Sequence, residues 1–416
     1  MQNKSLISLS FLISLAAANL LEHPAVGAEP LKKPTKEEAD LKAKKADAEI
    51  DAYFKNKAIT SIQVVIEPSP GVVKPLSQLA AEPRKYAKAT ITEGGNVYPG
   101  VGVHLRGGLG SFRPVGEKAG FTINMDKFEG KLSFHGMGKW YLMNSAQDGS
   151  YISELISNEM LRAAGVPALR IKHAIVTLNG QPKGFYCLKE GYDSHFFKRN
   201  FPDPTGNFYD GGSLEGGVHI WQRDIDNPLE LLRGKGDVKD RADLKALVAA
   251  CREPDAKKRW ELLEKLLDMD VFISGFCIQA ILGDWDGYVF HKCNYRVYHD
   301  PKRNKLVFLP SGLDQEFGNP DQGSLVPPMQ GMVASAVYNT PEGKAKYLQR
   351  MAEINTTIMN TEKWLKRIDE LQALLQPAIT SVDAKAGAEY PNQIKRIRDF
   401  FTIRPKSIER QLKTAK

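Results

Sequence analysis

The chain has few cysteines, and they do not form metal-binding pairs. Cys187, Cys251, Cys277 and Cys293 are the four cysteines among 416 residues, and none of them belongs to a Cys-x-x-Cys motif. A structural zinc site is therefore not expected. In an exported protein four cysteines allow three disulfide connectivities. Cys187 and Cys277 lie in apolar runs, where buried free thiols are equally consistent, so the sequence leaves both states open.

Several motifs of familiar enzyme classes are also missing. There is no GxxxxGK[ST] phosphate loop and no GxGxxG fingerprint. Ser150 and Ser153 have no obvious histidine partner, which argues against a hydrolase triad. A phosphate-ester hydrolase is conceivable from carboxylates alone, but it has no clear nucleophile. The net charge of +8 lies largely in the lysine- and arginine-rich ends of the chain, as in solvated faces, so nucleic acid is not an expected partner.

Long apolar runs are confined to the first thirty residues. Lys4 precedes an apolar stretch from Leu6 to Leu21, and small residues end at Ala28. This order predicts a secretory signal peptide over residues 1–28 rather than a membrane anchor, because the apolar run is short and charged residues follow. No transmembrane segment is expected after signal cleavage. The expected location is secreted, periplasmic or in the cell envelope.

The rest of the chain predicts an α+β fold with a β-rich first part. Residues 29–57 are rich in Lys, Glu, Asp and Ala and predict a charged leader helix. Alternating apolar segments predict strands near residues 59–66, 86–92, 98–105, 121–125, 173–178 and 184–189. A helix capped by Asp148 or Ser150 and ended by Gly165 should separate the fourth strand from the fifth. Residues 193–416 predict mainly helices, with a polar loop at 284–294 and a short hairpin over 295–309.

A glycine-rich segment is the first candidate for chemistry. Arg106-Gly107-Gly108-Leu109-Gly110-Ser111 lies between predicted strands, and Lys118 follows it. Glycines allow backbone N–H groups to approach phosphate oxygens closely, and the two basic side chains would offset phosphate charge. The alternative is an ordinary hairpin loop with two solvated cations.

Two acidic segments are the other candidates. Asp284 and Asp286 lie in the polar loop with Asn294, where hard oxygen atoms suit Mg²⁺ or a carboxylate could accept a proton from a hydroxyl. Asp314 follows the last predicted strand and could be a second metal ligand. Each segment also fits an ordinary turn. Taken in order, the glycines, the lysine, the acidic helix and the Asp…Asn…Asp series are what phosphoryl transfer requires, although the short motifs of protein kinases are absent.

An ordered series of segments resembles the CotH kinase family, the atypical protein kinases first named for a spore-coat component. The segments are Tyr98–Gly108, Lys139–Asn144, Asp148–Ile152, Leu178–Glu190, Asp284–Tyr288, Asn294–Tyr298 and Leu313–Gly318. The resemblance extends from about residue 50 to residue 410, including the helix of Arg404.

The resemblance implies a two-lobed atypical protein-kinase-like fold, with an antiparallel β-rich N-lobe over 58–192 and a mainly helical C-lobe over 193–416. It implies binding of ATP with Mg²⁺ (or Mn²⁺) and transfer of the γ-phosphate to serine or threonine of an exported or surface protein acceptor. By position, Asp286 would be the catalytic carboxylate, and Asn294 and Asp314 would be metal ligands.

The resemblance also assigns roles to residues of the first lobe. Arg106 and Lys118 would contact the nucleotide phosphates. Glu159 is the better candidate to pair with Lys118, and Glu154 is the open alternative. Glu190 would lie near the hinge between the lobes, or else would only order a local turn.

Two departures from the family pattern support a second hypothesis. Gly312 stands where many relatives carry an aspartate, and the interval from Asp286 to Asn294 is longer than in ordinary kinases. The alternative is therefore a catalytically inactive kinase fold that acts as a surface or envelope binding or structural protein.

Overall fold

A computed structural model of the chain describes residues 36–67, 86–108, 110–130, 132–211, 213–215, 218–220, 222–234 and 240–415. The predicted signal peptide lies outside these residues. The chain divides into a unit of residues 1–42 and a unit of residues 43–416. The description below concerns the second unit. Helix α1 (Lys36–Lys55) ends within it, in the region of the predicted leader helix.

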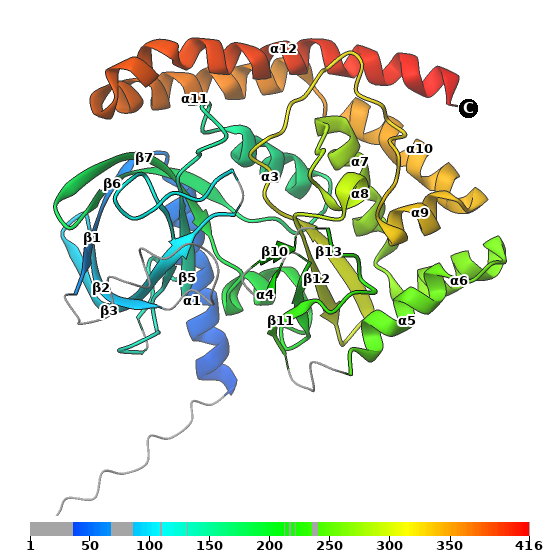
Figure 1. Ribbon diagram of the computed structural model, residues 1–416, viewed down its shortest axis with the longest axis horizontal. Coiled ribbons are helices and arrows are strands. Elements are labelled where there is room, and N and C mark those ends of the chain that lie inside the picture. The colour runs from blue at the N-terminus through cyan, green and yellow to red at the C-terminus, as the bar shows by residue number, and fades with distance from the viewer. Residues whose placement is uncertain are drawn as a thin grey trace, which may run out of the picture. The chain divides into compact units, whose positions relative to one another are not determined.

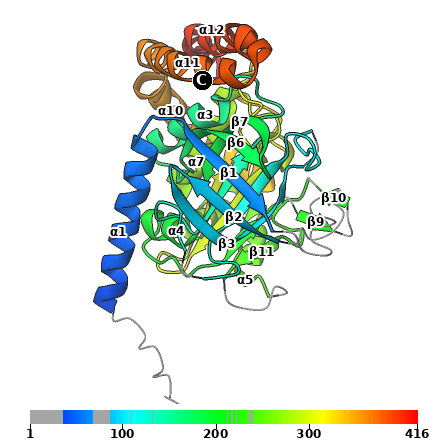
Figure 2. The same cartoon turned by 90° about the vertical axis from the view of Figure 1, so that its left-hand side faces the viewer.

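The first part of this unit is a sheet that closes on itself (Figures 1 and 2). Its strands are β1 (Thr60–Ile66), β2 (Ala87–Glu93), β3 (Asn96–Arg106), β4 (Gly120–Asn124), β5 (Lys139–Met143), β6 (Ile171–Leu178) and β7 (Gln181–Glu190). The order is β1-β2-β3-β4-β5-β7-β6, and the pairs are antiparallel except that β1 and β6 run parallel. The predicted strands are thus confirmed. The closing pair joins Thr60 to Ala174, a contact that no local pattern indicates.

Apolar side chains at alternate positions of the strands fill the interior of the closed sheet. Val64, Ile91, Phe121 and Trp140 are buried in one apolar cluster. Helix α1 contributes Ile50 and Tyr53 to the same cluster, so its second half is part of the core. Burial of such side chains is the main favourable term that holds the strands in register.

Helix α3 (Ser153–Ala163) lies between β5 and β6, as predicted, but it begins later than Asp148 or Ser150. Its N-cap residue, Ile152, makes no side-chain cap hydrogen bond. The buried carboxylate of Asp148 accepts hydrogen bonds from the N–H groups of Ser150 and Ser153, at 2.9 and 3.1 Å. Asp148 therefore caps the first turn from outside the helix, which corrects its predicted position.

The second part contains the remaining strands and most helices. They are α4 (Ser194–Asn200), β8 (Phe208–Asp210), β9 (Ser213–Glu215), β10 (Val218–Ile220), β11 (Glu230–Arg233), α5 (Ala242–Cys251), α6 (Ala256–Leu266), α7 (Met269–Leu282), α8 (Tyr288–His291), β12 (Tyr295–Asp300), β13 (Lys305–Pro310), α9 (Met332–Tyr338), α10 (Pro341–Thr357), α11 (Thr361–Val382) and α12 (Ala384–Thr414). The predicted hairpin is confirmed as β12 and β13, which extend a small sheet in the order β11-β8-β12-β13.

Helix α7 is central to this part, because nearly all of its residues are buried. It ends at Gly283, whose φ of +73° is the left-handed conformation that favours glycine at a helix end. The chain then enters the polar loop that contains Asp286. Helices α11 and α12 lie side by side as a long pair (Figures 1 and 2). Both helices and strands are therefore abundant, and the α+β class is confirmed.

Two further expectations can be compared with the fold. The four cysteines are free thiols, with Cys187, Cys277 and Cys293 buried, so the structure contains no disulfide among them. In the ranges that the structure describes, no helix combines the length and apolarity needed to cross a membrane.

Candidate active site

A pocket forms where the end of β3 and the start of α3 meet the segment after β13. It is lined by Arg106, Gly107, Ser111, Gly120, Met143, Asn144, Ser145, Asp148, Glu154, Cys187 and Asp314. The first predicted segment, at Arg106, and the third, at Asp314, therefore share one pocket although they are far apart in sequence.

The glycine-rich segment forms a tight, internally bonded loop at this pocket. Gly107 has a φ of +119°, and a Cβ there would lie 2.9 Å from the backbone of Phe112. The N–H of Gly108 donates to Ser111 Oγ at 3.0 Å. Asn144 holds the loop from β5, because its amide nitrogen donates to the carbonyls of Ser111 and Lys118, both at 2.9 Å. Glycine at position 107 is thus required by the backbone itself.

Arg106 lines the pocket, and its positive charge is not paired with a carboxylate of the described residues. Its guanidinium lies over the ring of Tyr141, 4.1 Å from the ring centre, and its Nε donates to the sulfur of Met143. Within the described ranges, no ion pair joins it to an acidic side chain. An arginine held in this way presents a planar donor group to an anion such as phosphate.

Lys118 and Glu159 do not meet. Lys118 Nζ donates to the hydroxyl of Tyr151 at 2.8 Å and lies over the rings of Tyr151 and Tyr186. Burial lowers the pKa of Lys118 to about 8. Glu159 instead binds the guanidinium of Arg367 on α11, at 2.7 and 3.2 Å. In the structure Glu159 therefore pairs with Arg367 and not with Lys118.

The open alternative, Glu154, does line the pocket, and its partner is a lysine that sequence reasoning missed. Glu154 Oε1 accepts a hydrogen bond from Lys189 Nζ of β7, and the two side chains are 6% and 3% exposed. The pair ties the first turn of α3 to β7. The available signal was Lys189, which directly follows the apolar run Phe185–Leu188 of β7 and stands two residues after Cys187, so that both side chains lie on the same face of the strand.

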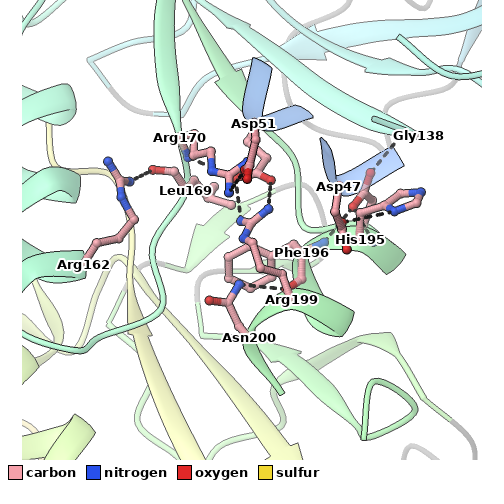
Figure 3. Close-up of polar contacts among 12 residues, drawn as sticks. Asp47, Asp51, Gly138, Arg162, Leu169, Arg170, His195, Phe196, Arg199 and Asn200 are labelled. Atoms are coloured by element: carbon pink, nitrogen blue, oxygen red, sulfur yellow. Dashed lines mark hydrogen bonds and ion pairs between the residues drawn. The ribbon is translucent and has the colours of Figure 1, made fainter. Parts of the chain in front are cut away.

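Glu190 is fully buried, but it is not among the residues that line the pocket. Arg199 of α4 donates to both of its carboxylate oxygens, at 2.6 and 2.9 Å, and the N–H of Arg170 donates at 3.1 Å. Figure 3 shows the surroundings, where Asp51 and Asp47 of α1 contact Arg170 and His195. Glu190 therefore orders the junction of β7, α4 and α1.

The polar loop brings Asp286 and Asn294 together. Asn294 Nδ2 donates to Asp286 Oδ2 at 2.7 Å, and the carbonyl of Asn294 accepts the N–H of Ser311 at 2.9 Å. The structure gives a physical reason for glycine at position 312, where many relatives carry an aspartate. The φ of Gly312 is +67°, and a Cβ there would lie 2.8 Å from Cγ of Asn294. The missing side chain leaves room for Asn294, so an aspartate at position 312 would require Asn294 to move.

Asp314 and Asp284 carry unusually basic carboxylates. Burial raises the pKa of Asp314 to about 7, and the negative charges of Glu154 and Asp148 add to this effect. Burial likewise raises the pKa of Asp284 to about 7. Asp284 accepts a hydrogen bond from Gln279 at 2.8 Å and shares another with the buried Glu316, whose pKa is also raised. Burial therefore disfavours the charged forms of Asp284, Asp314 and Glu316.

These residues fit a magnesium ion that is completed by phosphate oxygens. In the described part of the chain no group of three or more His, Cys, Asp or Glu side chains is arranged as a protein-only metal cage. Magnesium commonly takes only one or two carboxylates together with substrate phosphates and water. Asn294 and Asp314 would supply hard oxygen donors, with Asp286 beside Asn294, and a divalent cation would offset the negative charge of the pocket carboxylates Asp148, Glu154 and Asp314.

Comparison with known families decides the classification. The family described as CotH kinase protein matches residues 103–408. This chain belongs to the CotH kinase family. The matched region contains every candidate residue from Arg106 to Asp314. Invasin CotH3 of Rhizopus delemar is 26% identical over 196 residues, which cover 42% of this chain and 31% of the fungal protein. The similarity to this CotH protein thus extends over less than half of either chain.

A lysine that is kept charged at a buried position should reduce the stability of the fold. In this CotH domain Lys118 carries its charge below about pH 8, and its lowered pKa means that this charge destabilises the folded state relative to the unfolded state. We expect Lys118→Met to be more stable than the wild type at pH 7 by about 1–3 kcal/mol. The difference should shrink as pH rises through 8 and vanish near 10.5, where the unfolded lysine also loses its proton. Urea unfolding at several pH values measures it, and Lys395→Met, at an exposed position, should show no such trend.

Proposed function

We propose that this CotH family member is a phosphotransferase that binds ATP with Mg²⁺ (or Mn²⁺). It would transfer the γ-phosphate to a serine or threonine hydroxyl of an exported or surface protein. The observation that carries the proposal is the shared pocket, in which Arg106 and the glycine loop face the carboxylate of Asp314. Basic and backbone donors opposite acidic oxygens form the arrangement that a metal–triphosphate complex needs.

Each candidate residue has a defined part in this proposal. Arg106 and Lys118 bind phosphate oxygens, while Asn294 and Asp314 hold the ion. The bound ion supplies charge neutralisation for the phosphates. The acceptor hydroxyl oxygen forms a bond to the γ-phosphorus as the bond from that phosphorus to the β–γ bridging oxygen breaks, and ADP leaves. Asp286, oriented by Asn294, takes the hydroxyl proton.

The cellular setting and the lobes belong to the same proposal. The signal peptide predicted over residues 1–28 supports export, and the name invasin of the fungal relative is compatible with a surface role. We assign residues 58–192 to an N-lobe and 193–416 to a C-lobe, with the leader over residues 29–57. The closed sheet before β8 and the helices after it support this division.

A non-catalytic binding or structural role is the competing function. The observation that favours it is Gly312, which removes one carboxylate from the expected family pattern. The raised pKa of Asp314 fits either function, since a cation could bind without turnover. The two functions differ in whether phosphate is transferred after ATP has bound.

Asp286→Asn separates the two functions. We expect phosphate transfer from γ-labelled ATP, to the protein itself or to an exported protein acceptor, to fall by about 10²–10⁴-fold, because a positioned general base contributes a factor of that size. Calorimetric ATP affinity with Mg²⁺ should change little, since the variant keeps Asp314 and Arg106. Wild-type protein that binds ATP but transfers no phosphate to any acceptor would favour the binding role. Wild-type protein that binds no ATP would rule out the proposal.

A further inference from the structure

Arg404 of α12 is a buried cation whose partners are all backbone carbonyls. It is 1% exposed and among the largest fully buried side chains. Its Nε and Nη2 donate to the carbonyls of Ile281 and Ala280, each at 2.9 Å, and its Nη1 donates to that of Gly323 at 2.6 Å. Over the described ranges, Arg404 forms no ion pair with a carboxylate.

Burial of this positive charge is unfavourable in free energy, so it requires a compensating interaction. Burial lowers the pKa of Arg404 to about 10, and removing a cation from water without a counter-ion is unfavourable by several kcal/mol. The carbonyls of Ala280 and Ile281 belong to the last turn of α7, where the helix dipole concentrates partial negative charge. The end of α7 therefore acts as the counter-charge of Arg404.

The carbonyls that Arg404 contacts lie on either side of the candidate site in sequence. Ala280 and Ile281 immediately precede the loop that contains Asp286, and Gly323 follows the segment that contains Asp314. The same two segments meet directly where the N–H of Phe317 donates to the carbonyl of Leu282 at 3.1 Å. Arg404 thus links the segment before Asp286 to the segment after Asp314.

Two more side chains of α12 contact segments next to the pocket. Arg396, two turns before Arg404, donates to the carbonyls of Glu316 and Phe317 at 2.8 and 3.0 Å. Tyr390 donates to the carbonyl of Ser150, just before α3, at 2.9 Å. Tyr390 and Arg404 lie on one face of α12 and Arg396 on an adjoining face, so a single helix contacts all three segments. Glu154 of α3, Asp286 and Asp314 therefore depend on a common support.

We propose that Arg404 is a positioning residue that sets the separation of Asp286 and Asp314, with Arg396 supporting the Asp314 segment. This inference rests on the proposed function, because the separation matters only if both carboxylates serve one metal–nucleotide complex. Magnesium demands near-ideal octahedral geometry, whereas calcium accepts variable geometry and longer bonds. A small displacement of the metal ligand Asn294, which is hydrogen-bonded to Asp286, relative to the metal ligand Asp314 should therefore weaken magnesium-dependent nucleotide binding more than calcium-dependent binding.

The test compares ATP affinity with Mg²⁺ and with Ca²⁺ by calorimetry on the full chain. Arg404→Lys keeps the charge but cannot reach the same carbonyls together, and Arg396→Ala removes only two hydrogen bonds. We expect each variant to weaken Mg²⁺-dependent binding, by about 10–100-fold for Arg404→Lys, the usual cost of losing a group that orients metal ligands. The ratio of Mg²⁺- to Ca²⁺-dependent affinity should fall. Arg398→Ala, on the same helix but paired with Asp369 of α11, should leave both affinities unchanged.

Three results would overturn the inference. Folded Arg404→Lys and Arg396→Ala proteins that bind ATP as the wild type does, with an unchanged metal ratio, would show that the contacts do not set the site. An equal loss with both ions, together with a lower melting temperature, would show a purely structural role. Wild-type protein that binds ATP with neither ion would instead overturn the proposed function, and this inference with it.

Discussion

Asp314→Asn is expected to abolish Mg²⁺-dependent ATP binding and, at the same time, to make the nucleotide-free protein more stable above pH 7. Loss of a carboxylate that binds the metal ion should cost roughly 3 kcal/mol or more, which is at least about 100-fold in affinity. The stability gain follows from the burial of this carboxylate, which raises the pKa of Asp314 to about 7, and the charges of Glu154 and Asp148 add to the effect.

The pH dependence of this effect has a definite sign. A carboxyl group whose pKa is raised in the folded state stabilises the fold when protonated, and that stabilisation is lost as pH rises from about 4 to 7. Asparagine carries no charge, so the variant should lose less stability over this interval and should be more stable than the wild type by about 1–3 kcal/mol above pH 7. Urea unfolding at pH 5, 6, 7 and 8 measures the difference.

Asp399→Asn is the matched control. Asp399 is exposed on α12 and pairs with Lys395, so its replacement should change neither ATP affinity nor the pH profile of stability. If Asp314→Asn bound ATP normally with Mg²⁺, Asp314 would not be a metal ligand. If it were less stable than the wild type at pH 8, burial and neighbouring charges would not disfavour the ionised Asp314 carboxylate in the folded protein.

Lys189→Met should destabilise the protein by about 3–5 kcal/mol, because it leaves the Glu154 carboxylate buried without a counter-charge. The two side chains are 3% and 6% exposed, so water cannot solvate the remaining charge. Denaturant unfolding at pH 7 measures the loss. The double variant Glu154→Gln/Lys189→Met removes both charges and should recover most of the stability, which tests the pair rather than the packing of one side chain.

Lys172→Met is the control for this pair. Lys172 is also nearly buried, on the neighbouring strand β6, but its Nζ lies over the ring of Tyr53 at 3.9 Å and donates to a backbone carbonyl. Within the part of the chain that the structure describes, Lys172 is not ion-paired, and the nearby Glu93 keeps its hydrogen bonds to Thr60 and His135 when Lys172 is replaced, so the loss should be much smaller than at Lys189. Equal losses at both positions would mean that packing, and not the ion pair with Glu154, determines the cost.

Local sequence patterns were sufficient for much of the secondary structure. Alternation predicted six of the seven strands of the closed sheet but not β5, and the turn between β6 and β7 falls on Asn179-Gly180, where both residues have positive φ. The start of α3 was predicted too early because Asp148 looks like an N-cap residue. Its carboxylate does bind the N–H of Ser153, but across an irregular segment that includes Tyr151 at a φ of +57°.

The candidate site could be predicted only in part. The order of glycines, lysine, Asp286, Asn294 and Asp314 is a property of the chain, and the family match over residues 103–408 agrees with it. Which charged residues pair with one another cannot be read from the sequence. Glu154 and Glu159 lie on one helix five residues apart, and nothing in their neighbourhood indicates that one meets Lys189 and the other Arg367.

The sequence by itself determined the α+β class, the family and the identity of the groups that can perform chemistry, because periodicity and residue type are local. Tertiary structure alone decided the parallel pairing that closes the sheet, the contact of Gly312 with Asn294 and the burial of Arg404 against the end of α7. Each of these depends on segments distant in sequence that meet in space. Their energies come from packing and desolvation, which no single segment contains.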